Sequence, residues 1–227
     1  MERGELSRER IIEAAVTVAD RGGIAAASMR GVAAELGVEA MSLYHHIPNK
    51  AALLSALADV VFDEITLPRS DRPWRPELRA RYLSSRDALA RHPWGLGLIE
   101  GQRQPGPSTL RQHESVLGCL RSNGFSVHLA AHAFSVLDSY VYGFVLTELS
   151  LPFTPEEGAE EMMREMALAA DEYPHLVEFA VEKVHGKGYA YASEFEYGLD
   201  LILDALTQQL SSDTALTGVS PAPTVDS

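Results

Sequence analysis

The chain has 227 residues, 46% of them hydrophobic, and its formal net charge is -13. This length and apolar content suffice for a sizeable buried core and one or two domains. The acidic charge excludes a protein that attracts nucleic acid over its whole surface, so a DNA-binding function must come from a local element. The single cysteine, Cys119, excludes a disulfide framework and a multi-cysteine zinc site, and its apolar neighbours favour a small core residue.

The charge is unevenly spread along the chain. Residues 1–50 carry six Lys or Arg and seven Asp or Glu, whereas the remainder carries 13 basic and 25 acidic residues. A nearly neutral head on an acidic body is compatible with DNA held at one end only, and equally with an ordinary solubilising surface on the body. The N-terminus lacks the apolar run of a signal peptide, and no stretch approaches about 18 consecutive apolar residues. We therefore expect a cytoplasmic protein with no membrane partner.

Apolar residues recur at helical spacing throughout, which predicts an all-α fold. Ser7, Ser28 and Asn49 are placed to cap helices, while Gly22–Gly23 and Gly37 are placed to end them. A Pro-, Arg- and Asp-rich stretch, residues 68–76, favours a linker. We expect helices over residues 7–22, 28–36, 39–46, 49–61, 76–91, 107–122, 126–150, 156–171, 174–186 and 192–210.

The second and third expected helices are joined by so few residues that they must cross steeply, which is typical of a helix-turn-helix. An inner apolar seam would leave Ala40, Met41, Ser42, Tyr44 and His45 on the outer face of the third helix. A helix in this setting fits the DNA major groove, with Arg30 and Lys50 flanking it near the phosphates. Ser28 is first an N-cap, and any phosphate contact would be secondary. By spacing alone, such helix pairs also occur in proteins that never touch DNA.

Four segments add a resemblance: Ile11–Ala15, Ser28–Arg30, Ala34–Val38 and Ser42–Leu54. They closely resemble the DNA-binding domain of the TetR family of bacterial repressors, over about residues 7–62. The resemblance implies that Arg30 contacts DNA, that Tyr44 and Lys50 lie near phosphates, and that the groove is faced by Ala40, Met41, Ser42, His45 and His46. Partial packing of Tyr44, and a capping or packing role for His46, remain open alternatives.

A helix-turn-helix protein reads two half-sites as a dimer, so the body should supply a two-fold interface. The segment 195–206 resembles the C-terminal domain of tetracycline-repressor-type members, which implies dimerisation through helices 126–150 and 192–210 as a four-helix bundle. The apolar side chains assigned to this interface are Phe134, Leu137, Val141, Val145, Phe195, Leu199, Ile202, Leu203 and Leu206. Packing of these stripes within one chain is the alternative.

The same resemblance implies a ligand cavity between the body helices, on the side toward the head. Its expected lining is His113, Leu117, His132, Phe134, Ser135, Asp138, Ser139 and Thr147. Asp138 is a carboxylate among apolar residues and needs a partner if it is buried, which a core or dimer contact would also supply. His128 and His132 share a helix face, but no third ligand is apparent, so we expect no metal and no cofactor. Sensing of a tetracycline–magnesium complex is not implied, because the residues that would contact it have no match.

These observations predict a helix-turn-helix domain over residues 1–62, a helical sensor and dimerisation domain over 63–210, and a disordered tail over 211–227. The leading hypothesis is a repressor whose homodimer binds palindromic double-stranded DNA and is released by a small, mainly apolar effector. An enzyme is disfavoured because the chain has no phosphate-binding loop, nucleophile elbow or metal-spaced cluster. A helical DNA-binding adaptor whose body binds a protein partner is the alternative.

Overall fold

A computed structural model describes residues 5–99, 105–152, 171–184 and 190–217. Every regular element in these residues is helical, which confirms the all-α prediction. The α-helices are α1 (Arg8–Ala26), α2 (Met29–Leu36), α3 (Ala40–Leu43), α4 (Lys50–Asp63), α5 (Trp74–Arg91), α6 (Leu96–Ile99), α7 (Pro107–Ser122), α8 (Val127–Leu149), α10 (Pro174–Phe179) and α11 (Glu194–Thr217). Short turns are η1 (Pro93–Gly95), the π-turn η2 (Ala180–Val184) and η3 (Tyr191–Ser193).

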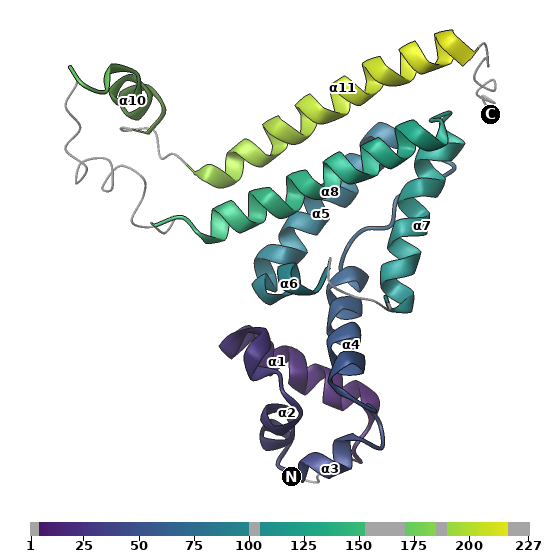
Figure 1. Ribbon diagram of the computed structural model, residues 1–227, viewed down its shortest axis with the longest axis vertical. Coiled ribbons are helices and arrows are strands. Elements are labelled where there is room, and N and C mark those ends of the chain that lie inside the picture. The colour runs from purple at the N-terminus through teal and green to yellow at the C-terminus, as the bar shows by residue number, and fades with distance from the viewer. Residues whose placement is uncertain (1–4, 100–104, 153–170, 185–189, 218–227) are drawn as a thin grey trace.

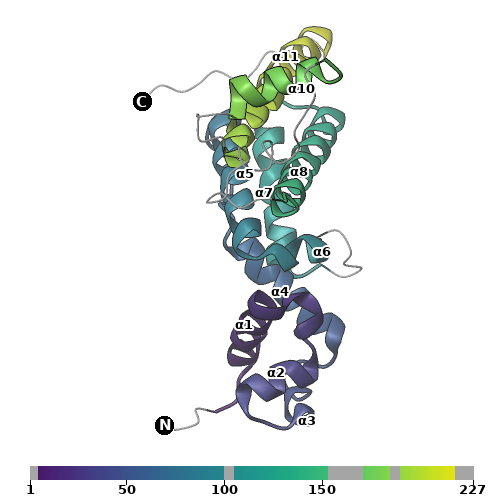
Figure 2. The same cartoon turned by 90° about the vertical axis from the view of Figure 1, so that its left-hand side faces the viewer.

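The molecule is elongated, with a small head of α1, α2 and α3 at one end and the longer helices of the body at the other (Figures 1 and 2). The predicted caps form as expected: the side chains of Ser7, Ser28 and Asn49 accept hydrogen bonds from backbone amides in the first turns of α1, α2 and α4. Gly23 has a non-helical backbone with φ 71° and ψ 174°, so the first straight helix ends at Gly22–Gly23 as predicted. A short kinked extension continues to Ala26.

Helix α4 joins the head to the body and stands between them in Figure 1. Its buried side chains point to several sides of the helix: Leu53, Ala56, Leu57, Ala58, Val61 and Phe62. They pack against α1 of the head and against α5, α6 and α7 of the body. One helix therefore belongs to both cores, so a movement of α4 relative to the body carries the head with it.

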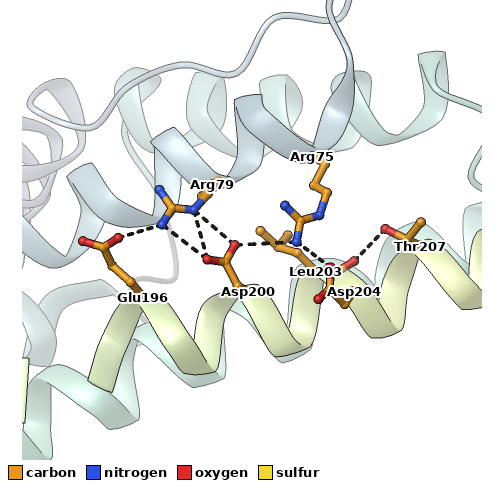
Figure 3. A network of polar contacts seen from close by, with 7 residues as sticks. All are labelled: Arg75, Arg79, Glu196, Asp200, Leu203, Asp204 and Thr207. Atoms are coloured by element: carbon orange, nitrogen blue, oxygen red, sulfur yellow. Dashed lines mark hydrogen bonds and ion pairs between the residues drawn. The ribbon is translucent and has the colours of Figure 1, made fainter. Parts of the chain in front are cut away.

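The body core lies between α5, α7, α8 and α11, and α8 and α11 run side by side (Figure 1). A polar network fastens α11 to α5 (Figure 3). Arg79 donates to Glu196 at 2.7 Å and to Asp200 at 3.1 Å, while Arg75 donates to Asp204 at 2.5 Å. The acidic side chains of α11 follow one another at four-residue intervals, so they form a row that faces the two arginines.

The assignment of the dimer interface is wrong for most of its residues. Leu137, Val141, Val145, Phe195, Leu199 and Leu203 are at most 1% exposed, and Leu206 is 7% exposed. These side chains fill the core of their own chain, where α8 and α11 pack on α5 and α7. Phe134 and Ile202 are only half-buried. The exposed apolar residues on the two helices are instead Val136, Leu146, Leu149, Tyr197 and Leu201.

Two further boundaries differ from the sequence prediction. Helix α11 extends to Thr217, so residues 211–217 are helical rather than part of a disordered tail. The expected third helix is shorter than predicted, because α3 covers Ala40–Leu43 and a turn follows it. The expected helix 156–171 falls almost wholly outside the described residues, and the expected helix 174–186 corresponds to α10 with the π-turn after it.

Helix α8 is long and apolar enough to cross a membrane by length and composition alone. It packs on α5, α7 and α11, and it buries the carboxylate of Asp138 among them. Core helices of globular proteins have the same composition. The packing of α8 therefore accounts for one apolar face, and its exposed face requires a separate explanation.

Candidate DNA-binding site and body cluster

The turn between α2 and α3 is built by Gly37. This residue adopts a left-handed conformation with φ 65° and ψ 37°, and its amide donates to the carbonyls of Ala33 and Ala34. The amide of Val38 donates to the carbonyl of Ala33 at 3.0 Å, which completes the cap. Only glycine adopts this conformation without strain, and it turns the chain so that α3 crosses α2. The predicted helix-turn-helix is therefore present.

The inner side of this pair is fully packed. Val32, Leu43 and Ile47 are at most 1% exposed, and Ala33 is 3% exposed, so α2 and α3 approach closely. The outer side carries the residues expected to face DNA. Met41 is 73% exposed and Tyr44 is 43% exposed. His45 and His46 are exposed as well, while Ala40 and Ser42 are half-buried. The structure therefore brings the predicted reading residues onto one outward surface at the tip of the head.

Positive charge flanks this surface. The side chains of Arg30 on α2 and Lys50 at the start of α4 are exposed, and neither forms an ion pair within the part of the chain that the structure describes. Asn49 caps α4 by accepting a hydrogen bond from the Ala52 amide at 2.8 Å. The positive end of the α4 dipole and the Lys50 ammonium thus point to the same side. An anion such as a DNA phosphate would be stabilised there. Ser28 accepts from the Gly31 amide at 3.1 Å, so its hydroxyl is engaged as the N-cap of α2.

The body contains a buried polar cluster on α5 and α8. Tyr82 donates a hydrogen bond to Asp138 at 2.9 Å, and the Arg81 guanidinium lies over the Tyr82 ring, 4.7 Å from its centroid. Arg81 and Tyr82 are at most 1% exposed, and Asp138 is 9% exposed. Burial raises the pKa of Asp138, against the opposing effects of Arg81 and of the Tyr82 hydrogen bond. Burial also raises the pKa of Tyr82. Asp138 therefore has the partner that its burial requires.

His113 of α7 adjoins this cluster. Its ring stands edge-on to Phe62 of α4, at a centroid distance of 5.9 Å, and edge-on to Phe134 of α8, at 5.2 Å. Burial lowers the pKa of His113, and the charges of Asp138 and Arg81 act on it in opposite directions. The structure thus brings together three of the predicted pocket residues, His113 on α7 and Phe134 and Asp138 on α8.

The remaining predicted pocket residues lie elsewhere. Leu117 is 37% exposed on the outer side of α7. Exposed side chains on the outward face of α8 belong to His132, Ser135, Ser139 and Thr147. These positions follow one another at helical spacing on the face opposite Leu137 and Val141. The assignment of these polar residues to one cavity within the chain is therefore wrong. The prediction treated the polar residues of α8 as one set, although Asp138 lies on the buried face and the others lie on the exposed face.

Helix α7 binds α4 at two points. The Gln112 side-chain amide donates to the carbonyls of Phe62 and Ile65, at 2.8 and 2.7 Å, where α4 ends. Thr109 donates to Asp59 through its amide and its hydroxyl, both at 3.1 Å. The carboxylate of Asp59 thereby caps the first turn of α7. Together with the ring contact between His113 and Phe62, these hydrogen bonds hold α4 against the buried polar cluster of the body.

A second set of contacts connects the body to α1. The ring of His92 lies 2.8 Å from Asp20 through Nδ1 and 3.1 Å from Glu64 through Nε2. Trp94 donates to the same Asp20 oxygen at 2.6 Å. A cavity of about 910 Å³ lies between α4, α6 and the start of α7. It is lined by Arg8, Pro48, Asn49, Ala51, Ala52, Leu54, Ser55, Ala56, Asp59, Gly97, Leu98, Pro105 and Pro107. The head is therefore held to the body both through α4 and through the packing of α1 on η1.

Sequence reasoning missed Arg81, Tyr82 and Gln112. A signal for Arg81 was present, because it stands in the inward stripe of α5 with Leu78, Ser85 and Leu89 at helical spacing. An arginine in such a stripe is buried unless its side chain reaches the surface.

Cys119 is fully buried, as its neighbours indicated, and burial raises the pKa of its thiol to about 11. Within the described residues, no group of three or more His, Cys, Asp or Glu side chains is placed to hold a metal ion.

Two family models match the chain. Residues 11–57 match the model described as bacterial regulatory proteins, tetR family, and residues 67–210 match the tetracyclin repressor-like C-terminal domain. Among curated relatives, the HTH-type transcriptional repressor DrrR1 of Streptomyces coeruleorubidus is 34% identical over 212 residues, covering 88% of this chain and 77% of the relative. The class D tetracycline repressor protein of Escherichia coli is 32% identical over 170 residues, covering 70% and 78%.

The solved structures agree with these relatives. Apo ActR from Streptomyces coelicolor has a TM-score of 0.75 and 26% identity, over 92% of this chain and 98% of its own. The complex of ActR with actinorhodin has a TM-score of 0.74 and 26% identity, over 90% and 96%. The helix-turn-helix of the head, the helical body and these matches lead to one conclusion: the chain belongs to the TetR family of transcriptional regulators.

Proposed function

We propose that the chain is a repressor whose homodimer binds a palindromic operator in the cytoplasm and leaves it when a small, mainly apolar molecule occupies the body. The observation that carries the proposal is the dual attachment of α4. Its first residue, Lys50, stands beside the reading surface, and its last turn is held by Gln112 in the body. Repression and ligand binding occur in relatives: DrrR1 is named a repressor, and ActR is solved with actinorhodin.

The contacts of α4 support a route from ligand to DNA. A molecule that enters beside His113 would displace its edge-on contacts with Phe62 and Phe134. Phe62 lies on the last turn of α4, whose carbonyl is bound by Gln112. Displacement there tilts α4, and the head follows, because α1 packs on α4. The effector releases DNA only to the extent that it binds the tilted state more tightly.

The exposed apolar face of α8 and α11 supports dimerisation. Val136, Leu146 and Leu149 on α8 are 45%, 60% and 45% exposed, and Tyr197 and Leu201 on α11 are 67% and 54% exposed. A monomer would leave these side chains in water on two adjacent helices. Pairing this face with its copy across a two-fold axis gives a four-helix bundle. We assign the homodimer interface to this face in place of the buried stripe predicted from the sequence.

DNA binding is tested by selecting duplexes from a random pool with the full chain and titrating the winning sequence at several salt concentrations. We expect a palindrome whose half-site centres lie about 34 Å apart, as two reading heads require. Lys50→Ala should weaken binding and lower the salt slope by about two, one phosphate contact for each subunit. Arg69→Ala removes an exposed charge from the linker and serves as the matched control. Recovery of no sequence at low salt would refute the repressor.

Dimerisation is tested by light scattering and by operator titration. The double variant Leu146→Glu, Leu201→Glu places charges in the proposed interface, so we expect a monomer and roughly a 100-fold weaker operator complex. Leu110→Glu is the matched control, because Leu110 is 53% exposed on α7, away from that face. A double variant that stays dimeric would reject this interface. A wild-type chain that is monomeric at micromolar concentration would reject the homodimer itself.

A further inference from the structure

The strongest unexplained feature of the body is the side chain of Arg81. It is 1% exposed, and within the described residues its only hydrogen bond runs from Nη1 to the Ser85 hydroxyl at 3.0 Å. Its Nε and Nη2 atoms are buried and have no hydrogen-bond partner among the described residues. A guanidinium presents five N–H donors and no acceptor, so several donors of Arg81 lack a protein acceptor.

The nearest buried carboxylate does not satisfy these donors. Asp138 accepts from Tyr82 at 2.9 Å and from Tyr142 at 3.5 Å. Neither of its oxygens is a hydrogen-bond partner of the Nε or Nη2 atoms of Arg81. Buried charges in proteins are ordinarily paired and hydrogen-bonded, so this arrangement lacks an anionic acceptor.

We propose that the effector bound by the body carries an anionic oxygen, a carboxylate or an ionised phenol or enol, which accepts hydrogen bonds from Arg81. The planar fork of Nε and Nη2 matches two oxygen acceptors of one such group. This inference rests on the proposed function, and it names the chemical class of the effector.

The side chains around Arg81 indicate what the rest of the effector is like. The guanidinium lies against the face of Tyr82, and its charge acts on His113, whose ring stands edge-on to Phe62 and to Phe134. Aromatic rings favour edge-on and offset-stacked neighbours, so an aromatic effector would pack favourably in this cluster. The effector is therefore an aromatic acid: an apolar ring frame that displaces the contacts of His113, with its acidic oxygen directed toward α5.

The test uses the full chain and two pairs of probes: naphthalene-2-carboxylate with its primary amide, and anthraquinone-2-carboxylate with its primary amide. Thermal shift and titration calorimetry measure binding. At least one carboxylate should raise the melting temperature and bind at least tenfold more tightly than its own amide. Arg81→Met should abolish that preference, because methionine keeps the apolar bulk and removes the donors. Arg81→Lys should retain a weaker preference, because it keeps the charge and loses the fork.

Arg79→Met is the matched control. It removes the same charge from the same helix, but Arg79 points outward to α11 (Figure 3), so the preference for the acid should persist. Equal binding of acid and amide, an Arg81→Met variant with the wild-type preference, or no binding by either carboxylate would overturn the inference. A neutral inducer that still releases the operator from Arg81→Met would overturn it while leaving the repressor intact. If the chain bound no operator, the repressor proposal would fail, but the preference for the acid over its amide could still be measured.

Discussion

The head and the body bury different kinds of side chain. The core of the head is apolar and made largely of small residues, with Ile11, Ala15, Val32 and Leu43 fully enclosed. All the buried polar or charged residues in the described chain lie in the body: Arg81, Ser85, His92, Ser108, Thr109, Gln112 and Asp138. An apolar core packed at close range has one favourable arrangement, whereas polar groups can exchange one partner for another. The head is thus suited to hold a fixed reading surface, and the body to change state.

The contrast also explains where the two parts meet. Polar contacts supplement the apolar packing of α4 at these junctions: Gln112 holds the end of α4, and His92 and Trp94 hold Asp20 of α1. Polar contacts are directional, so a small displacement breaks them, while the close-packed core of the head keeps its arrangement. A rigid head on polar attachments moves as one body.

The largest effect should come from opening the core of the head. Leu43→Ala removes a fully buried side chain and should lower the free energy of unfolding by about 2–5 kcal/mol. Met41→Ala, on the same short helix, is the control. Met41 is 73% exposed, so its stability should change by less than about 0.5 kcal/mol. Denaturant melts measure both, and similar values for the two would mean that the head has no rigid core.

A smaller effect is expected where α7 holds α4. Gln112→Ala removes the side-chain donor to the carbonyls of Phe62 and Ile65, which should cost about 1–3 kcal/mol. The Phe62 carbonyl keeps its hydrogen bond from the Ile65 amide. Glu114→Ala, an exposed change on the same helix, should be silent in the same thermal melt. The ratio of operator affinities with and without effector should also fall for Gln112→Ala, because the end of α4 is released. An unchanged ratio would show that α4 transmits the signal without this bond.

The head could be predicted closely from sequence because its structure is set by local chemistry. Caps at Ser7, Ser28 and Asn49 and the turn at Gly37 depend on residues within four positions of one another, and all four form. Gly23 also takes a positive φ where the sequence predicted a helix end, and a kinked extension follows it to Ala26. Which of the exposed residues reads DNA remains a prediction.

The body could be predicted only in part, because packing against helices that are distant in the sequence decides which face of each body helix is buried. Leu137 is buried and its neighbour Val136 is 45% exposed, yet both are apolar. The periodicity of α8 shows two faces, but only packing on α5, α7 and α11 decides which of them is internal. The inward stripe of α5 signals the burial of Arg81, but the lack of acceptors for its Nε and Nη2 donors depends on residues far away in the sequence. The helical architecture was predictable, and the identity of the interface was not.

The pH dependence of stability should distinguish the body from the head. Burial raises the pKa of Asp138, so the native state binds this proton more tightly than the unfolded state does. Stability should therefore decline as pH rises from the ordinary aspartate value through the raised one. Asp138→Asn keeps an acceptor for Tyr82 and should flatten this part of the curve. A parallel decline in the variant, in melts between pH 4 and 8, would assign the dependence to another group.

The smallest effect should come from the polar network between α5 and α11. Arg79 is 31% exposed, and its partners Asp200 and Glu196 are 37% and 62% exposed, so solvent screens these pairs. Arg79→Ala should cost about 0.5–1 kcal/mol, and most of the difference should vanish in 1 M salt. Arg69→Ala breaks an ion pair between residues two apart in an exposed loop, where no helices are joined, and should leave the melting temperature unchanged. If Arg79→Ala instead cost several kcal/mol at any salt concentration, α11 would be held on the body mainly by charge. The apolar side chains that α11 buries would then contribute less to its attachment than apolar packing contributes to the core of the head.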